Sequence, residues 1–186
     1  MTAIGFACDC GTLRGELHVA PRSGSLVACH CADCRATARF HGRPWDPAQG
    51  QRVWHTTPDH VRILTGADRL AAIRVSPKGF LRWHASCCGT PLGASTDGPA
   101  VPFCGLRTAC LDTDAPLGPV VAAAYVNAGV GKTRHRAFGR IVRGVVLRAL
   151  VARLGFRRGN PFLNADGQPI GPIHVLTERE RAELYA

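Results

Sequence analysis

The chain has 186 residues, of which 46% are hydrophobic, as is typical of one globular domain or of a small domain with an appendage. It contains no apolar run of about eighteen residues, which excludes a membrane-spanning helix, and its N-terminus lacks the pattern of a secretory signal. We therefore expect a cytoplasmic protein with reduced thiols. Nine cysteines, an odd number, also argue against a pure disulfide framework.

The net charge of +10 is concentrated in one part of the chain. Nine of the 23 basic residues lie between Gly131 and Arg158, a segment without Asp or Glu, and the rest of the chain is almost neutral. This asymmetry favours an acidic partner such as nucleic acid, an anionic lipid surface or another protein. The alternative is a solvated face of a small basic protein.

Short strands separated by glycine and proline are predicted from the N-terminus to about Asn127. Many of these segments are β-branched or alternate apolar with polar residues, as half-buried strands do. Their number and spacing predict an all-β sheet or a barrel-like module. The predicted strands are Ile4–Cys8, Leu13–Val19, Leu26–Cys29, Gln51–His55, Val61–Thr65, Leu70–Val75, Phe80–Trp83, Leu92–Ser95 and Val120–Val126, with a short helical turn over Cys31–Phe40.

The pattern becomes helical after a predicted linker at 128–131. A helix is expected from about Arg134 to Leu154, ending at Gly155, with an apolar stripe opposite Arg136, Arg140 and Arg143. The stripe comprises Phe138, Ile141, Val142, Val145 and Ala149. Past Val146 the apolar residues surround the helix, so this end is predicted to be buried.

The chain is predicted to end in a loop and a short helix. Residues 160–172 read as loop, and the capping-box spacing of Thr177 and Glu180 should start a final helix to about Leu184. The predicted division is therefore a β domain, residues 1–127, followed by a basic, partly helical extension, residues 128–186.

Cys8 and Cys10, followed by Gly11, form the first thiol cluster. Two thiols cannot close a tetrahedral zinc site, and the adjacent Cys87 and Cys88 are the nearest chemical match. A site closed by four protein ligands is structural, because it joins distant strands. The alternative is that these cysteines are buried as small apolar residues.

Cys29, Cys31 and Cys34 form the second cluster, in the sequence Cys-His-Cys-x-x-Cys. Three thiols within six residues can reach one metal and leave a fourth position open, the mark of a catalytic zinc. An external thiol bound there would become a positioned thiolate. His30 is interpreted as structural or as a support for the ligands, because its neighbours are better ligands. Asp33 and Arg35 could meet a charged substrate, but such residues on a turn are more often plain surface.

Cys104 and Cys110 are isolated in the sequence and are interpreted as core or surface thiols. His84, four residues before Cys88, could replace a missing ligand. A further alternative is thiol redox chemistry, with either Cys87-Cys88 or the second cluster cycling between reduced and oxidised forms.

Three motifs together resemble those of the glutathione-dependent formaldehyde-activating enzyme family, also called the centromere-protein-V domain. They are Cys8-x-Cys10-Gly11, Cys29-His30-Cys31-x-x-Cys34-Arg35 and Cys88-Gly89-Thr90-Pro91-Leu92, and the resemblance covers about residues 3–112. It implies a mainly β, Mss4-like "β-tent" of small stacked antiparallel sheets, here with a C-terminal helical extension. It also implies two zinc ions, a structural one and a catalytic one on Cys29, Cys31 and Cys34.

The resemblance further implies carbon–sulfur lyase activity of the S-(hydroxymethyl)glutathione synthase type, which joins glutathione to formaldehyde. The chain departs from the late family motif, because Ala85 stands where the family has its first cysteine. Neighbouring cysteines in an extended strand point in opposite directions, so both can bind one ion only in an unusual turn. The structural site is therefore expected to use Cys8, Cys10, Cys88 and one of Cys87, His84 or Cys104.

Two functions follow from these observations. The first is a zinc enzyme that activates a small thiol, such as glutathione, toward an aldehyde at the second cluster. The second is a non-catalytic, zinc-stabilised binding module whose basic segment, residues 131–158, contacts nucleic acid, anionic lipid or a protein.

Overall fold

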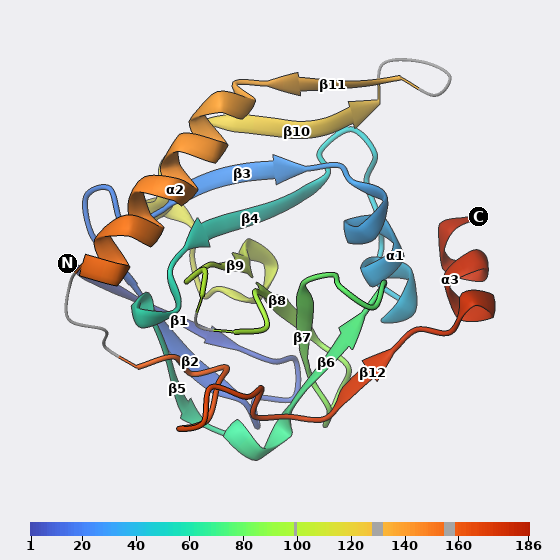
Figure 1. Cartoon of the computed structure of the whole chain (residues 1–186), viewed down its shortest axis with the longest axis horizontal. Coiled ribbons are helices and arrows are strands. Elements are labelled where there is room, and N and C mark those ends of the chain that lie inside the picture. The colour runs from blue at the N-terminus through green and yellow to red at the C-terminus, as the bar shows by residue number, and fades with distance from the viewer. Residues whose placement is uncertain (99, 128–131, 155–158) are drawn as a thin grey trace.

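A computed structural model describes residues 1–98, 100–127, 132–154 and 159–186. Within these residues the chain forms a three-stranded sheet, a nine-stranded sheet and three α-helices (Figure 1). The predicted mainly β class is confirmed. No helix in the described part of the chain combines the length and apolarity that a membrane span needs.

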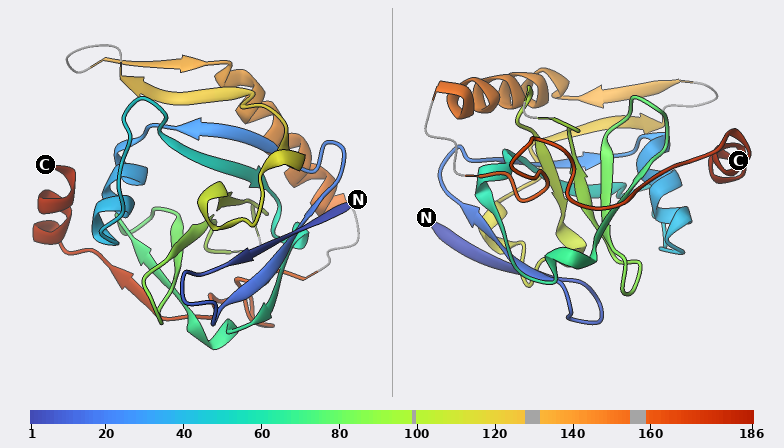
Figure 2. Two further views of the ribbon diagram at one scale, coloured as in Figure 1. Left: turned by 180° about the vertical axis from the view of Figure 1, so that it is seen from behind. Right: turned by 60° about the horizontal axis from the view of Figure 1, so that its bottom comes forward.

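The three-stranded sheet is antiparallel, in the order β1 (Thr2–Ala7), β2 (Arg14–Val19) and β5 (Val61–Thr65). Apolar side chains alternate along β1, where Ile4 and Phe6 are buried. This sheet lies on the far side in Figure 1 and comes forward in the left view of Figure 2.

The nine-stranded sheet is mixed. Seven of its nine strands lie within residues 1–127, and only the pairs β10–β3 and β12–β6 are parallel. Its strands, in spatial order, are β11 (Thr133–Arg136), β10 (Ala122–Asn127), β3 (Ser25–Cys29), β4 (Gln51–Thr56), β9 (Cys104–Arg107), β8 (Pro91–Ser95), β7 (Leu81–Ala85), β6 (Leu70–Arg74) and β12 (Ile173–Val175).

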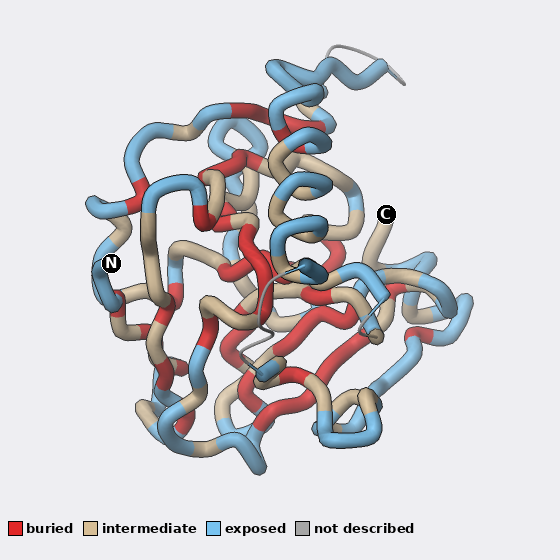
Figure 3. The backbone as a smooth tube through the Cα atoms, turned by 60° about the vertical axis from the view of Figure 1, so that its left-hand side comes forward, coloured by how far each residue is buried: buried red, intermediate tan, exposed pale blue. Residues whose placement is uncertain are grey.

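One face of this sheet packs into the main core. A row of residues in register crosses five strands, and the core also takes in Ile4, Phe6 and Leu17 of the smaller sheet. In Figure 3 the buried residues, in red, form continuous segments of the chain, whereas many of the outer turns are exposed and pale blue. The row consists of Leu26, Trp54, Leu106, Gly93 and Trp83.

Gly93 is required by the close approach of two strands within this row. A Cβ atom there would lie 2.2 Å from the backbone oxygen of Gly105. Trp83, which is 1% exposed, stacks on Phe162 with ring centroids 5.3 Å apart and donates from Nε1 to Ser95 Oγ at 2.8 Å. The indole is thus buried with its polar atom satisfied.

The opposite face of the sheet carries the polar side chains of His55, Arg82 and Arg107 among small and apolar residues. His55, Gly105, Ala94 and Arg82 lie in register on this face, and Arg107 occupies the next row beside Val53. Because side chains alternate between the faces of a strand, these residues all point away from the main core.

Two helices border this second face. α1 (Ala32–Phe40) begins within the second cysteine cluster and contains Cys34 in its first turn. Cys31 caps this helix, with Sγ accepting from the Cys34 amide at 3.4 Å. The helical turn predicted over Cys31–Phe40 is confirmed. α2 (Phe138–Leu154) packs through Ile141 and Val145 on Val27, Ala122 and Ala124.

The helix predicted from Arg134 is wrong in its first residues. Thr133–Arg136 instead forms β11, which pairs with β10, and Ala137 with φ of 56° separates this strand from α2. The predicted linker at 128–131 and the predicted stop at Gly155 lie outside the described residues.

The prediction that the end of α2 is buried is also wrong. Only Ile141 of this helix is fully buried, and Phe138 and Val142 of the predicted stripe are exposed. The sheet reaches only one side of the helix, so the apolar residues elsewhere on it face outward. Those past Val146 that are exposed are Leu147, Leu150, Val151 and Leu154, together with Val146 itself.

The C-terminal segment runs along the sheet to α3 (Glu178–Tyr185), which packs beside α1 (Figure 1). The predicted capping box is confirmed, because the Thr177 side chain accepts from the Glu180 amide while the Glu180 side chain accepts from the Thr177 amide. Strands β9 and β12 had no predicted counterpart. The remaining short elements are the 3₁₀ turns η1 (Pro58–His60), η2 (Ala67–Arg69), η3 (Thr108–Cys110) and η4 (Ala115–Leu117).

Candidate metal centres

The structure brings Cys8, Cys10, Cys87 and Cys88 together, and we call them the four-thiol cluster. Their Sγ atoms all lie within 4.8 Å of one another. The Sγ distances are 3.5 Å for Cys8–Cys10, 3.8 Å for Cys8–Cys87, 3.3 Å for Cys10–Cys87 and 3.9 Å for Cys87–Cys88. Four sulfurs around zinc at about 2.3 Å would lie about 3.8 Å apart, so this donor set fits a tetrahedral metal.

Two turns deliver these thiols. Cys8 and Cys10 follow β1 in a turn where Gly11 has φ of 73°, a left-handed conformation that favours glycine. Cys87 and Cys88 lie in the turn after β7, where the amides of Cys88 and Gly89 donate to the Ala85 oxygen at 3.4 and 2.8 Å. The adjacent cysteines are therefore not in an extended strand, and both sulfurs reach the same centre.

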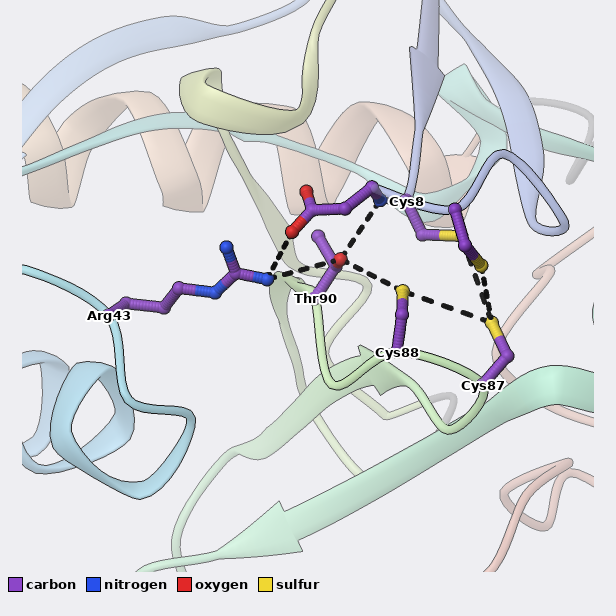
Figure 4. A network of polar contacts seen from close by, with 7 residues as sticks. Cys8, Arg43, Cys87, Cys88 and Thr90 are labelled. Carbon is purple, nitrogen blue, oxygen red and sulfur yellow. Dashed lines mark hydrogen bonds and ion pairs between the residues drawn. The ribbon is translucent and has the colours of Figure 1, made fainter.

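Thr90 connects this cluster to the rest of the molecule (Figure 4). Its Oγ1 lies 3.1 Å from Cys88 Sγ, accepts from the Asp9 amide at 3.0 Å, and accepts from Arg43 Nη2 at 3.3 Å. Arg43 also forms an ion pair with Asp9. A ligand turn with such fixed neighbours is pre-organised for binding.

The thiols of this cluster differ in pKa. The hydrogen bond between Cys10 Sγ and Thr12 lowers the pKa of Cys10 to about 6, and interaction with Cys10 raises the pKa of Cys87 to about 12. Shared hydrogen bonds in a thiol group let one member ionise while its neighbour keeps its proton. Metal binding would then release the remaining protons.

Cys29, Cys31 and Cys34 form the three-thiol cluster at the end of β3 and the start of α1. Their sulfurs lie within 4.8 Å of one another, with Cys29 and Cys31 3.4 Å apart. Among the described residues no further Cys, His, Asp or Glu joins this group. Three thiolates satisfy three of the four positions of a tetrahedral metal and leave one open.

Arg82 provides a positive charge beside this cluster. It is buried, donates from Nη2 to Asp33 Oδ2 at 3.1 Å, and places Nη1 3.9 Å from Cys34 Sγ. Hydrogen bonds with Cys29 and Cys31, together with the Arg82 charge, hold the pKa of Cys34 well below its usual value. Hydrogen bonding to its neighbours and burial raise the pKa of Cys29. Arg82 thus offsets negative charge where three thiolates would meet a metal.

Asp33 is in turn held by the C-terminal helix. Tyr185 donates its hydroxyl to Asp33 Oδ1, and the Tyr185 backbone oxygen accepts from Arg35 Nη2 at 3.0 Å. Asp33 and Arg35, interpreted from sequence as plain surface, therefore form internal contacts.

A cavity of about 630 Å³ opens beside the three-thiol cluster on the second face of the large sheet. Its volume lies in the usual range for a small-molecule site. The polar lining includes Arg82, Arg107, His55 and Gln51 next to the three thiols, and the apolar lining includes Val27, Val53, Phe80, Phe103 and Ile141. No ion pair within the described residues engages Arg107, and its buried Nε has no hydrogen-bond partner.

His55 lies on the same wall. Burial, reinforced by the charge of Arg148, lowers the pKa of His55 to about 4, and its Nδ1 has no hydrogen-bond partner. His55, Arg82 and Arg107 were missed from the sequence. The available signal was a polar side chain at alternate positions of otherwise apolar strands, as in Leu81-Arg82-Trp83.

The remaining candidate residues belong to neither thiol group. His84 contacts His41, with ring centroids 4.6 Å apart, and His30 Nδ1 lies 3.2 Å from the Pro47 oxygen. Cys104 and Cys110 are buried, and burial raises the pKa of each. Of the three alternatives for a fourth ligand, Cys87 is the one whose thiol lies with those of Cys8, Cys10 and Cys88.

Comparison with known proteins places the chain in a family without an assigned activity. A search of curated proteins finds no match. Among solved structures, the crystal structure of a Rhodobacter sphaeroides protein aligns at 19% sequence identity, covering 62% of this chain and 96% of that chain, with a TM-score of 0.44. The model of a family described as "Family of unknown function (DUF6151)" matches residues 1–157, so the chain belongs to this family.

Proposed function

We propose that the protein is a zinc enzyme that joins a small thiol to a small aldehyde at the three-thiol cluster. The observation that carries the proposal is a group of three converging thiols, with no fourth protein ligand among the described residues, beside a cavity of about 630 Å³. The motif resemblance to the formaldehyde-activating family supports the same reaction.

The two clusters would have different roles. The four-thiol cluster, closed by protein ligands, would hold a structural zinc that ties the turn after β1 to the turn after β7. Cys29, Cys31 and Cys34 would hold the second zinc. When bound there, zinc would supply a Lewis acid that lowers the pKa of an incoming thiol.

The arginines of the cavity would orient the thiol substrate. Arg82 lies beside Cys34 and would offset the added negative charge of a thiolate. Arg107, without an ion-pair partner among the described residues, is suited to an anionic group such as a carboxylate of glutathione. The apolar side chains that line the cavity would limit water in the site.

The proposed reaction balances without an oxidant. The substrate sulfur attacks the carbonyl carbon and forms a carbon–sulfur bond, while the carbonyl π electron pair moves to the oxygen. That oxygen then takes up a proton equivalent to the one lost by the thiol. The product with formaldehyde and glutathione is S-hydroxymethylglutathione, and the reverse reaction is a carbon–sulfur lyase step. None of the nine cysteines, which all lie within the described residues, is in a disulfide, so the seven cysteines of the two clusters can serve as metal ligands.

The test is exchange between glutathione plus formaldehyde and their adduct, followed by NMR with zinc-loaded protein. We expect about two zinc ions per chain and exchange faster than the spontaneous rate. Cys34→Ser should abolish the acceleration, whereas Cys10→Ser, which removes a thiol from the other cluster, should retain it in the fraction that stays folded. An unaccelerated rate with the fully loaded wild-type protein would refute the reaction.

A second measurement separates thiol binding from catalysis. Cobalt replaces zinc in thiolate sites and reports a changed coordination sphere by its visible absorption. Adding glutathione to the cobalt protein should alter the spectrum in the wild-type protein and not in Cys34→Ser. An unchanged wild-type spectrum would mean that the fourth position does not accept a thiol.

A further inference from the structure

The outward surface of α2 carries an unusual set of apolar side chains. Leu150 is 49% exposed, Val151 69% and Leu154 88%. Single exposed apolar residues scattered over a protein surface are normal. On this helix, by contrast, most of the large aliphatic residues are in contact with solvent. The exposed set is Val142, Val146, Leu147, Leu150, Val151 and Leu154.

The side of α2 that faces the large sheet fixes the orientation of the helix. Ile141 and Val145 pack on Val27 and Ala124, and Arg148 Nη1 donates to Ser25 Oγ at 3.2 Å. Because these contacts attach one side of α2 to the large sheet, its exposed leucines and valines cannot turn inward without breaking them.

Positive charge is interleaved with the apolar side chains. Arg140, Arg143 and Arg153 are exposed on the same helix, and residues 132–154 contain no Asp or Glu. None of the ion pairs within the described ranges engages a basic residue of this segment. The surface therefore combines unneutralised arginines with aliphatic groups.

The adjoining strand extends this surface. Every residue of β11 is exposed, and β11 lies at the edge of the sheet on the same side as α2 (Figures 1 and 2). An aromatic group joins the two elements: His135 lies 4.9 Å from the Tyr125 ring and 4.6 Å from the Phe138 ring, measured between centroids. Tyr125 is 44% exposed and Phe138 38%.

We propose that α2 and β11 form a surface that lies on an anionic lipid membrane. An interfacial helix buries aliphatic side chains at the boundary of headgroups and acyl chains while its arginines contact lipid phosphates. Long arginine side chains can reach the headgroups although their Cα atoms lie among apolar residues. Exposed aromatic rings beside the helix suit the same boundary.

Other partners explain less of this surface. Nucleic acid would engage the arginines through phosphates and leave the leucines and valines in water. A second copy of the chain would bring two acid-free basic helices together, and like charges across an interface are costly. Anionic lipid is the partner that satisfies both the charge and the apolar side chains.

The test is co-sedimentation of the full chain, as purified, with vesicles. Vesicles containing phosphatidylglycerol in phosphatidylcholine should bind the protein, vesicles of phosphatidylcholine alone should bind it far less, and added salt should weaken binding. Leu150→Ser should weaken binding about tenfold through the lost apolar burial. Arg143→Gln should weaken it about fivefold through the lost charge.

Matched controls are available elsewhere on the molecule. Leu64, in β5, is also 49% exposed, so Leu64→Ser changes surface apolarity equally and should leave vesicle binding unchanged. Arg62→Gln on the same strand, likewise exposed, controls for the lost charge. Circular dichroism of each variant checks that α2 remains folded.

Four results would overturn the proposal. Two come from the vesicle assay: no binding to anionic vesicles, or equal loss of binding in Leu64→Ser and Leu150→Ser. The other two are found in the absence of vesicle binding: tight binding to duplex DNA or RNA that Leu150→Ser leaves intact, or a dimer in solution that Leu150→Ser dissociates. None of these results depends on the zinc chemistry proposed above.

Discussion

Acidification should destabilise the fold through His55. Burial, with a smaller effect of the Arg148 charge, lowers the pKa of this imidazole from its usual value near 6.5 to about 4. The unfolded chain therefore binds a proton below about pH 6.5 that the folded chain does not take up. Because the unfolded state gains protons first, the free energy of unfolding decreases as the pH falls. This penalty is absent above about pH 6.5 and complete below about pH 4.

The size of this effect follows from the pKa difference. One pKa unit corresponds to about 1.4 kcal/mol, so the full shift is worth about 3 kcal/mol, of which about 2 kcal/mol has developed at pH 5. His55→Phe removes the titrating group and keeps a ring edge-on to Phe103, 5.2 Å away in the wild-type protein. The Nδ1 atom that the change deletes has no hydrogen-bond partner, so the substitution should cost little at pH 7.

The assay is urea unfolding of wild-type and His55→Phe protein at pH 7 and pH 5, both loaded with the same metal. We expect the wild-type protein to lose about 2 kcal/mol more than the variant between the two pH values. His60→Phe, in η1 and outside the cavity lining, is the matched control for replacing an imidazole by a phenyl ring. Equal pH dependence in wild-type and His55→Phe protein would show that His55 is not held neutral by burial.

Three further outcomes are expected. Cys87→Ser should remove one metal ion per chain and lower the melting temperature. Cys110→Ser, whose thiol lies outside both clusters, should keep the wild-type metal content. An unchanged number of metal ions per chain in Cys87→Ser would exclude Cys87 as a ligand. Gly93→Ala should lower the free energy of unfolding by about 1–3 kcal/mol, measured with urea, because its Cβ would lie 2.2 Å from a backbone oxygen. Gly98→Ala, with no atom within 4 Å of its Cβ, should be nearly neutral, and equal effects would contradict the close approach. Thr177→Ala should cost about 1 kcal/mol of local stability and speed amide hydrogen exchange in Glu178–Tyr185, since it removes a helix cap; unchanged exchange would mean that the cap does not hold α3.

The strands of the first two-thirds of the chain could be predicted because their signals are local. Alternation of apolar and polar residues, with glycine and proline between segments, located nine strands that all have a counterpart in the structure. β9 and β12 were missed, since each is four residues or fewer, and β12 also depends on pairing with β6, far earlier in the sequence. β11 was assigned to a helix because its basic residues carry no alternation, and only pairing with β10 makes it a strand.

The thiol spacing likewise determined which cysteines of the second cluster converge, because a turn of six residues allows little else. The first cluster needed the tertiary structure: the turn after β7 brings Cys87 and Cys88 to Cys8 and Cys10, while His84 and Cys104 stay elsewhere. The sequence alone also did not indicate which cationic side chain would lie beside the substrate. Arg82 and Arg107 lie 25 positions apart in the sequence, yet the strand registers place both on the same face of one sheet, beside Cys34. Local periodicity determines secondary structure and ligand spacing, whereas strand pairing alone decides which polar side chains share a cavity.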